Sequence, residues 1–148
     1  MPLFDTHGDS EFKNLTRSTL PLRAYWNNAS TVLSTIGTAL GIDDLVNVQP
    51  LFEYPTASAT SRDKASYSDV MVVSPSTAIA VEGKWTEPRY ETVSKWQIRG
   101  NESNREKVLS HWLQLIGKKA PELKQDAISQ IPYQMIHRTA SACANGDK

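Results

Sequence analysis

Two short apolar runs with a turn between them constrain this chain more than any other feature. The runs cover residues 66–73 and 78–85, and both are rich in β-branched and small apolar side chains. The residues between them, Ser74-Pro75-Ser76-Thr77, are typical of a turn. This order predicts a β-hairpin, with Asp69 near the start of its first strand and Glu82 near the end of its second.

Three polar side chains mark one end of the predicted hairpin. Side chains alternate between the two faces of a strand, so Glu82 and Lys84 point the same way and Gly83 points the other way. Antiparallel pairing places Asp69 beside Glu82 across the ladder. We therefore expect two carboxylates and one amine to meet at the end of an otherwise apolar hairpin.

These three groups suit the metal-assisted hydrolysis of a phosphodiester bond. Mg²⁺ prefers oxygen ligands and is commonly held by one or two carboxylates together with substrate phosphate oxygens. Asp69 and Glu82 are the predicted ligands of Mg²⁺, with Mn²⁺ as its substitute. A metal-bound water is acidified and becomes a nucleophile. Lys84 would orient or deprotonate that water, or stabilise the charge that builds on the phosphate, and the sequence leaves these roles open.

The pattern resembles the PD-(D/E)xK superfamily of restriction-endonuclease-like nucleases over residues 51–143. Asp69 corresponds to the motif aspartate and Glu82-Gly83-Lys84 to the (D/E)xK element, while Ser68 stands where the motif has proline. The resemblance implies an α/β fold with a restriction-endonuclease-like core, in which α-helices flank a small mixed β-sheet. It also implies a bacterial or phage endonuclease or exonuclease that acts in restriction or another phage–host conflict.

Two more catalytic residues follow from the same resemblance. The superfamily often has a further carboxylate upstream of its aspartate, and Glu53 fills this place in a predicted strand over residues 51–56. Gln134 lies in a predicted helix over residues 133–144, which resembles the glutamine-bearing helix of exonuclease-like members. Each also has a structural interpretation, Glu53 as a surface residue at a strand end and Gln134 as a polar residue on a helix. The alternative functions are a non-catalytic module of the same fold, which binds nucleic acid or a protein partner and keeps the three residues as structure, and a purely structural interaction protein.

The distribution of charge indicates where nucleic acid would bind. The formal net charge is zero, from 16 basic and 16 acidic residues, which argues against a protein that coats nucleic acid indiscriminately. Basic residues nevertheless outnumber acidic ones between residues 84 and 119. We expect contacts with nucleic acid, DNA in preference to RNA, from Arg89, Lys95, Arg99 and Arg138. An ordinary solvated surface is the alternative interpretation of these charges.

Other chemistries and locations are disfavoured. One cysteine and three scattered histidines exclude a disulfide framework and a cysteine-rich zinc site within one chain. The seven dispersed glycines form no phosphate-binding loop. No apolar run reaches the length of a membrane span, and the first residues lack a signal-peptide pattern. These observations predict a cytoplasmic protein without a membrane partner.

The remaining segments predict supporting helices. Apolar spacing predicts one helix over residues 22–40, with Pro21 in its first turn and Gly41 at its end. A second helix is expected to begin at residues 103–106, which have capping-box spacing, and to end at Gly117.

The length fits a single nuclease-like domain over residues 1–148. Residues 1–15 are polar and are expected to be flexible. The domain is short for the superfamily, which fits a minimal domain, a truncated product, or a subunit completed by a second copy or a partner. We also expect residues 56–64 to form a connector at the mouth of the site and residues 89–104 to face the substrate.

Overall fold

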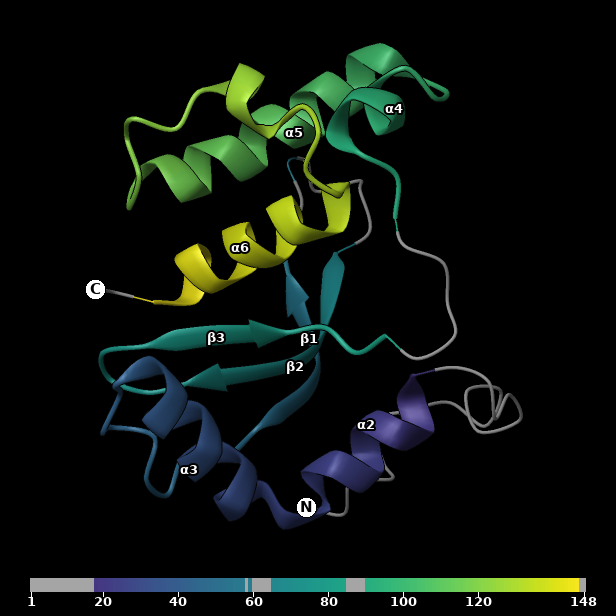
Figure 1. Cartoon of the computed structure of the whole chain (residues 1–148). Coiled ribbons are helices and arrows are strands. Elements are labelled where there is room, and N and C mark those ends of the chain that lie inside the picture. Colours follow the sequence, from purple (N-terminus) through teal and green to yellow (C-terminus); the bar gives the residue numbers. More distant parts are fainter. Residues whose placement is uncertain (1–17, 58, 60–64, 85–89, 147–148) are drawn as a thin grey trace.

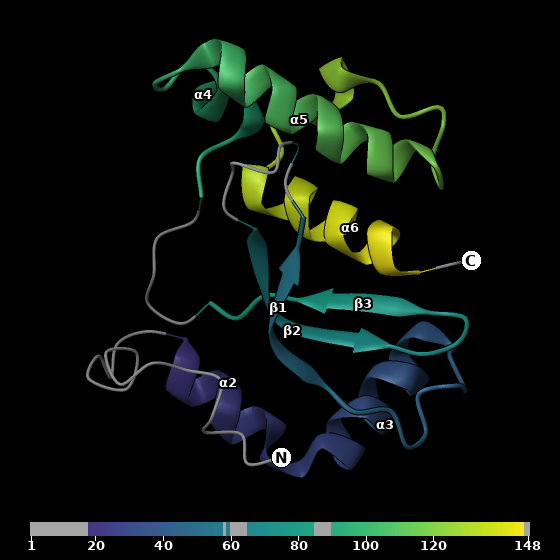
Figure 2. The ribbon, with the colours of Figure 1, turned by 180° about the vertical axis from the view of Figure 1, so that it is seen from behind.

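Helices cover both faces of a small sheet in the computed structural model, which describes residues 18–57, 59, 65–84 and 90–146. Helices α2 and α3 lie against one face, α6 crosses the other, and α4 and α5 lie beyond α6 (Figures 1 and 2). The elements in chain order are α2 (Thr19–Tyr25), the 3-10 helix η1 (Trp26–Asn28), α3 (Ala29–Leu40), β1 (Leu51–Thr56), β2 (Ser66–Val73), β3 (Ala78–Val81), α4 (Val93–Gln97), α5 (Glu102–Gly117), the 3-10 helix η2 (Gln125–Ile128) and α6 (Tyr133–Asn145).

The sheet has the strand order β1-β2-β3 and is antiparallel throughout its described residues. The predicted α/β class and the predicted hairpin are confirmed, because β2 and β3 pair with Val70 opposite Val81. The prediction of a mixed sheet was wrong. A parallel pair needs a crossover of about a dozen residues or more, and the connections over residues 57–65 and 74–77 are too short to supply one.

Strand β1 changes the face of its side chains at Glu53. Residues two apart in a strand ordinarily share a face. Phe52 nevertheless packs against Trp26 on the α2–α3 side, with ring centroids 6.4 Å apart, whereas the Tyr54 hydroxyl donates to Asn145 of α6 at 2.8 Å. Glu53 lies between them with a left-handed backbone, φ 48°. This conformation is unusual for a residue other than glycine, and it turns the strand locally.

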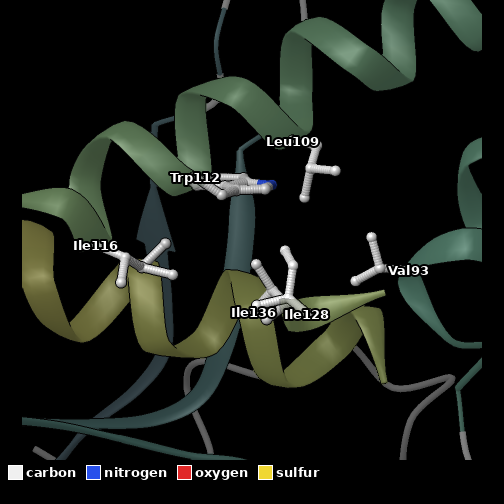
Figure 3. Close-up of a cluster of buried hydrophobic side chains, with 7 residues drawn as sticks. Val93, Leu109, Trp112, Ile116, Ile128 and Ile136 are labelled. Atoms are coloured by element: carbon white, nitrogen blue, oxygen red, sulfur yellow. The ribbon is translucent and has the colours of Figure 1, made fainter. Parts of the chain in front are cut away.

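Two hydrophobic clusters lie on opposite sides of the sheet. One joins α3 and neighbouring segments to the sheet through a set of buried apolar residues: Trp26, Val32, Leu33, Leu45, Val70 and Val72. The other joins α4, α5 and α6, as Figure 3 shows for its labelled members, Val93, Leu109, Trp112, Ile116, Ile128 and Ile136. The polar face of α6 therefore meets the sheet between two apolar cores.

The single helix predicted over residues 22–40 is broken in two. Trp26–Asn28 form a 3-10 turn, and Asn28 caps α3 by accepting a hydrogen bond from the Thr31 N–H at 3.4 Å. Asparagine competes for backbone donors in this way and so favours caps over helix interiors. The predicted stop at Gly41 is confirmed, since its left-handed φ of 67° ends α3.

The second helix also begins earlier than its capping-box spacing predicts. Asn101 is the N-cap of α5 and accepts a hydrogen bond from the Asn104 N–H at 3.0 Å, while the predicted stop at Gly117 is confirmed. The segment expected to face the substrate contains the short helix α4. Residues 1–15 and most of the predicted connector, at residues 58 and 60–64, lie outside the described residues. No helix in the described ranges is both long and apolar enough to traverse a lipid bilayer.

Candidate active site at the end of the β2–β3 hairpin

Asp69 and the Glu82-Gly83 segment lie side by side where the hairpin ends. The register that pairs Val70 with Val81 leads directly to Asp69 and Glu82 as the next opposed positions. Asp69 Oδ2 accepts a hydrogen bond from the Gly83 N–H at 2.8 Å. A Cβ at Gly83 would lie 3.2 Å from Leu22 Cδ1, which is a tight contact, and 3.5 Å from Asp69 Oδ2, which is an ordinary one, so the packing of α2 favours a small residue here.

Three donors surround the Glu82 carboxylate, and two of them come from α6. Arg138 Nε donates to Glu82 Oε2 at 2.5 Å, Gln134 Nε2 donates to Oε1, and Lys84 Nζ lies 3.1 Å from Oε1. Gln134 and Arg138 reach the same carboxylate because residues four apart lie on one helix face. The structure thus brings together four residues of the predicted site, with Arg138 beside Glu82.

The Asp69 carboxyl holds its proton to a higher pH than an ordinary aspartate does. Burial and the nearby negative charge of Glu82 raise its pKa to about 6, against the lowering effects of the Gly83 N–H and the charges of Arg138 and Lys84. Desolvation and a like charge both disfavour the ionised carboxylate. A positive ion between Asp69 and Glu82 would offset the same penalty.

The donor set fits a Mg²⁺ ion that keeps part of its water shell. Within the described ranges, no three or more His, Cys, Asp or Glu side chains form a group that would hold a metal. Two carboxylates suffice for Mg²⁺, because waters and substrate phosphate oxygens complete its octahedron. Asp69 Oδ2 is engaged by Gly83, and both Glu82 oxygens are engaged by donors. Each carboxylate oxygen has two lone pairs, so Glu82 Oε2 can coordinate an ion and still accept from Arg138.

Glu53 on β1 lies opposite Asp69 on β2, but it does not form a metal-binding group with Asp69 and Glu82. The pairs Phe52 with Val70 and Tyr54 with Ser68 bracket the two residues, which makes them opposed positions. Glu53, Asp69 and Glu82 nevertheless do not form a group of three metal ligands. Because the backbone of Glu53 is left-handed, its side chain does not take the direction that a regular strand would give it.

A serine and a histidine meet next to Arg138. Ser66 Oγ lies 2.7 Å from His137 Nδ1, which is the distance expected between a nucleophile and its base. Burial, followed by the charges of Arg138 and Lys84, lowers the pKa of His137 to about 3. An imidazole with this pKa is a poor base at neutral pH. The pair therefore does not suit nucleophilic catalysis and instead contributes hydrogen bonds to Arg138.

Comparison with protein families gives one match over nearly the whole chain. The model of a domain of unknown function, DUF6946, matches residues 4–148. The chain belongs to the DUF6946 family. Neither curated proteins nor solved structures gave a match.

An aromatic stack supports the α6 side of the DUF6946 site. The rings of Trp96 and Tyr133 stack with centroids 3.6 Å apart and an interplanar angle of 8°, and Tyr133 stacks on His137 at 5.2 Å. The Trp112 indole N–H donates to the Tyr133 hydroxyl at 3.0 Å. These contacts join α4, α5 and α6, so the cluster beyond α6 fixes the helix that carries Gln134 and Arg138.

The predicted nucleic-acid contacts occupy different environments in this DUF6946 chain. Lys95 is exposed on α4, and Arg99 is 73% exposed and paired with Glu91. Arg138 is only 13% exposed and is bound to Glu82. Arg89 lies outside the described residues. An exposed aromatic residue, Tyr90, has Lys84 Nζ 4.9 Å from its ring centroid and borders the site.

Ser66 was given no role in the predicted site, and His137 and Arg138 were expected at phosphate or at the helix end, not beside Glu82. The four-residue spacing of Gln134 and Arg138 was a signal that both side chains would reach one target. Ser66 had no such signal, because its partner His137 is 71 residues away in the sequence.

Proposed function

We propose that this DUF6946 protein is a Mg²⁺-dependent nuclease that hydrolyses phosphodiester bonds, with DNA preferred over RNA. One observation carries the proposal: Lys84 Nζ lies 3.1 Å from Glu82 Oε1 at the hairpin end where Asp69 is the next opposed residue. Two carboxylates and an amine at this spacing suit metal-assisted hydrolysis. The raised pKa of Asp69 supports the need for a cation at the pair.

The residues of the site have distinct roles in this proposal. Asp69 and Glu82 hold the ion, and the ion when bound supplies an acidified water and positive charge at the phosphate. Lys84 orients the attacking water or stabilises charge on the phosphate from its place beside Glu82. Gln134 and Arg138 fix the orientation of the Glu82 carboxylate. Glu53 contributes the negative charge of a further carboxylate from its place on β1 opposite Asp69.

The proposal includes a restriction-endonuclease-like core and a setting in bacterial or phage conflict. It is supported by the order of a helix, an antiparallel hairpin that carries the acidic residues, and a later helix that brings glutamine to the same site. A cut through both strands of a duplex would favour a two-fold dimer, so a homodimer or a partner subunit belongs to the same proposal.

A non-catalytic module of the same fold is the second candidate, and one observation favours it. Both oxygens of Glu82 already have donors, so this carboxylate is paired without a metal. A buried carboxylate that is fully paired can serve the fold alone. Such a protein would bind nucleic acid or a protein partner through its surface.

A cleavage assay separates the two candidates. The full chain is incubated with labelled single- and double-stranded DNA and RNA in Mg²⁺, in Mn²⁺ and in EDTA. We expect cleavage with either metal and none in EDTA. Lys84→Ala is expected to lower the rate by about 10²- to 10⁴-fold, the range for loss of a group that assists proton transfer or charge stabilisation. Lys118→Ala, which removes an exposed lysine after α5, is the matched control and keeps the rate.

Two outcomes would count against the nuclease. Equal behaviour of the wild type and Lys84→Ala on every substrate would remove the enzyme interpretation. Retarded mobility of DNA without any cleavage would favour the binding module instead.

A further inference from the structure

The hydrogen bonds around Arg138 determine the state of a neighbouring histidine. We infer that His137 is a positioning residue, held as the neutral Nε2–H tautomer, that keeps Arg138 directed at Glu82. The hydrogen-bond pattern stands by itself. Its consequence for metal binding rests on the proposed function.

The tautomer follows from donors and acceptors. Arg138 Nη1 lies 3.3 Å from His137 Nδ1 and 3.3 Å from Ser66 Oγ, and an arginine nitrogen can only donate. His137 Nδ1 must therefore accept, which places the ring proton on Nε2. Ser66 accepts from Arg138, and its own hydroxyl hydrogen is directed to His137 Nδ1 at 2.7 Å. Ser66 at 2.7 Å and Arg138 at 3.3 Å share the single lone pair of Nδ1, and only an unprotonated Nδ1 can accept from either of them.

The surroundings of the imidazole preserve this arrangement. His137 is buried, stacks on Tyr133 at 5.2 Å and lies 6.3 Å from the ring of Trp112. Burial and the positive charge of Arg138 lower its pKa, so the ring stays neutral throughout the physiological range. Rotation of the ring is hindered by the same stack. The position of Nδ1 is thereby fixed relative to α6 and to Ser66 of β2.

Arg138 transmits this position to the candidate active site. Its guanidinium is planar and rigid, so holding one of its nitrogens in place restricts the positions of the other two. Nη1 is held by Ser66 and His137, while Nε donates to Glu82 Oε2 at 2.5 Å. The orientation of the Glu82 carboxylate therefore depends on an acceptor at His137 Nδ1.

The first test measures the tautomer in the wild-type protein. Two-dimensional NMR that correlates the imidazole nitrogens with the ring carbon-bound protons distinguishes a protonated nitrogen from an unprotonated one. At pH 7 we expect His137 to show an unprotonated Nδ1 and a protonated Nε2. An imidazolium or the Nδ1–H tautomer would overturn the inference, and this measurement needs no variant.

The second test compares an acceptor with a ring of similar shape. His137→Asn places an amide oxygen near the position of Nδ1, whereas His137→Phe keeps an aromatic ring without an acceptor. The readout is the ¹H–¹⁵N signal of the Arg138 Nε–H and its rate of exchange with water. We expect the signal to be retained in His137→Asn and to be shifted and faster exchanging in His137→Phe.

His111 supplies the matched control. It also packs against Trp112, with ring centroids 5.1 Å apart, but has no contact with Arg138. His111→Phe should leave the Arg138 signal unchanged. An unchanged signal in a folded His137→Phe would show that Arg138 does not depend on His137, and if that variant does not fold, the wild-type tautomer decides the question.

Calorimetric titration with Mn²⁺ measures the consequence at the site. Groups that orient a metal ligand typically contribute 10- to 100-fold to metal affinity. We expect a weakening of about this size in His137→Phe, partial rescue in His137→Asn and none in His111→Phe. Absence of Mn²⁺ binding by the wild type would refute the proposed function and leave the NMR result intact. Equal Mn²⁺ affinity of all variants would refute the positioning role.

Discussion

Arg138 Nε lies 2.5 Å from Glu82 Oε2, although the two residues are 56 positions apart in the sequence. The contact joins α6 to the end of the β2–β3 hairpin, and both side chains are largely shielded from water, with 13% and 17% of their surfaces exposed. Such a pair differs from a surface ion pair, because the loss of one partner leaves the other charge poorly solvated.

Arg138→Gln should destabilise the fold more than a matched change at the surface. We expect the free energy of unfolding, measured by urea denaturation, to fall by about 1–3 kcal/mol because Glu82 keeps its charge and loses a donor. The control is Arg99→Gln, which breaks the exposed pair with Glu91 and should cost about 0–1 kcal/mol. Equal losses in the two variants would show that the Arg138 contact is as weak as a surface pair.

Asp69→Asn should stabilise the metal-free protein at high pH. The pKa of Asp69 is about 6 in the folded state and 3.8 in the absence of its surroundings. A carboxyl with a raised pKa stabilises the fold below both values and loses that contribution as the pH rises through 6. In EDTA at pH 8 we expect a gain of about 2 kcal/mol, which should vanish near pH 3.5. Asp43→Asn, which removes an exposed carboxylate, is the control.

The same substitution should reveal the titration of His137. Its pKa is lowered from 6.5 to about 3. Between these two pH values His137 is therefore protonated in the unfolded chain and neutral in the folded protein. This contribution lowers stability as the pH falls, whereas Asp69 raises stability over the same range, and the two nearly cancel between pH 6 and 4. In Asp69→Asn we therefore expect stability to decline by about 1.4 kcal/mol per pH unit across this range. Urea titrations at half-unit steps measure the slope, and an equally steep wild-type profile would contradict the cancellation.

Glu53→Asn should be more stable than Glu53→Gln. Both substitutions remove the charge and leave an amide, but asparagine adopts the left-handed region more readily. Because Glu53 has a φ of 48°, we expect the asparagine variant to be favoured by about 0.5–1 kcal/mol in thermal or urea unfolding. A glutamine variant of equal or greater stability would show that the backbone conformation at this position carries no strain.

The sequence was sufficient to predict the hairpin and its polar end, because both depend on local patterns. β-Branched residues and a Ser/Pro turn place Asp69 near the start of the hairpin and Glu82 near its end, although β3 ends at Val81 and not at the predicted residue 85. The prediction of one helix over residues 22–40 was wrong, also for a local reason. Apolar spacing continues through Asn28, but the asparagine side chain caps a new helix there.

The contacts made by α6 could not be derived in the same way. The final helix was predicted within one residue of its observed end, yet helical periodicity says nothing about which sheet residue its polar face meets. The bond of Ser66 to His137 joins segments 71 residues apart, and the turn at Glu53 breaks the alternation on which strand predictions depend. Both follow from tertiary packing between the two hydrophobic clusters.

The late position of α6 in the chain has a consequence for biosynthesis. Gln134 follows Glu82 by 52 residues, so a ribosome completes the acidic hairpin well before it adds the helix that orients it. A nascent chain that has folded only as far as β3 would hold Asp69 beside Glu82, and Glu82 would lack its two donors from α6. If the protein cuts nucleic acid, full activity would arise only after α6 has left the exit tunnel and packed on the sheet.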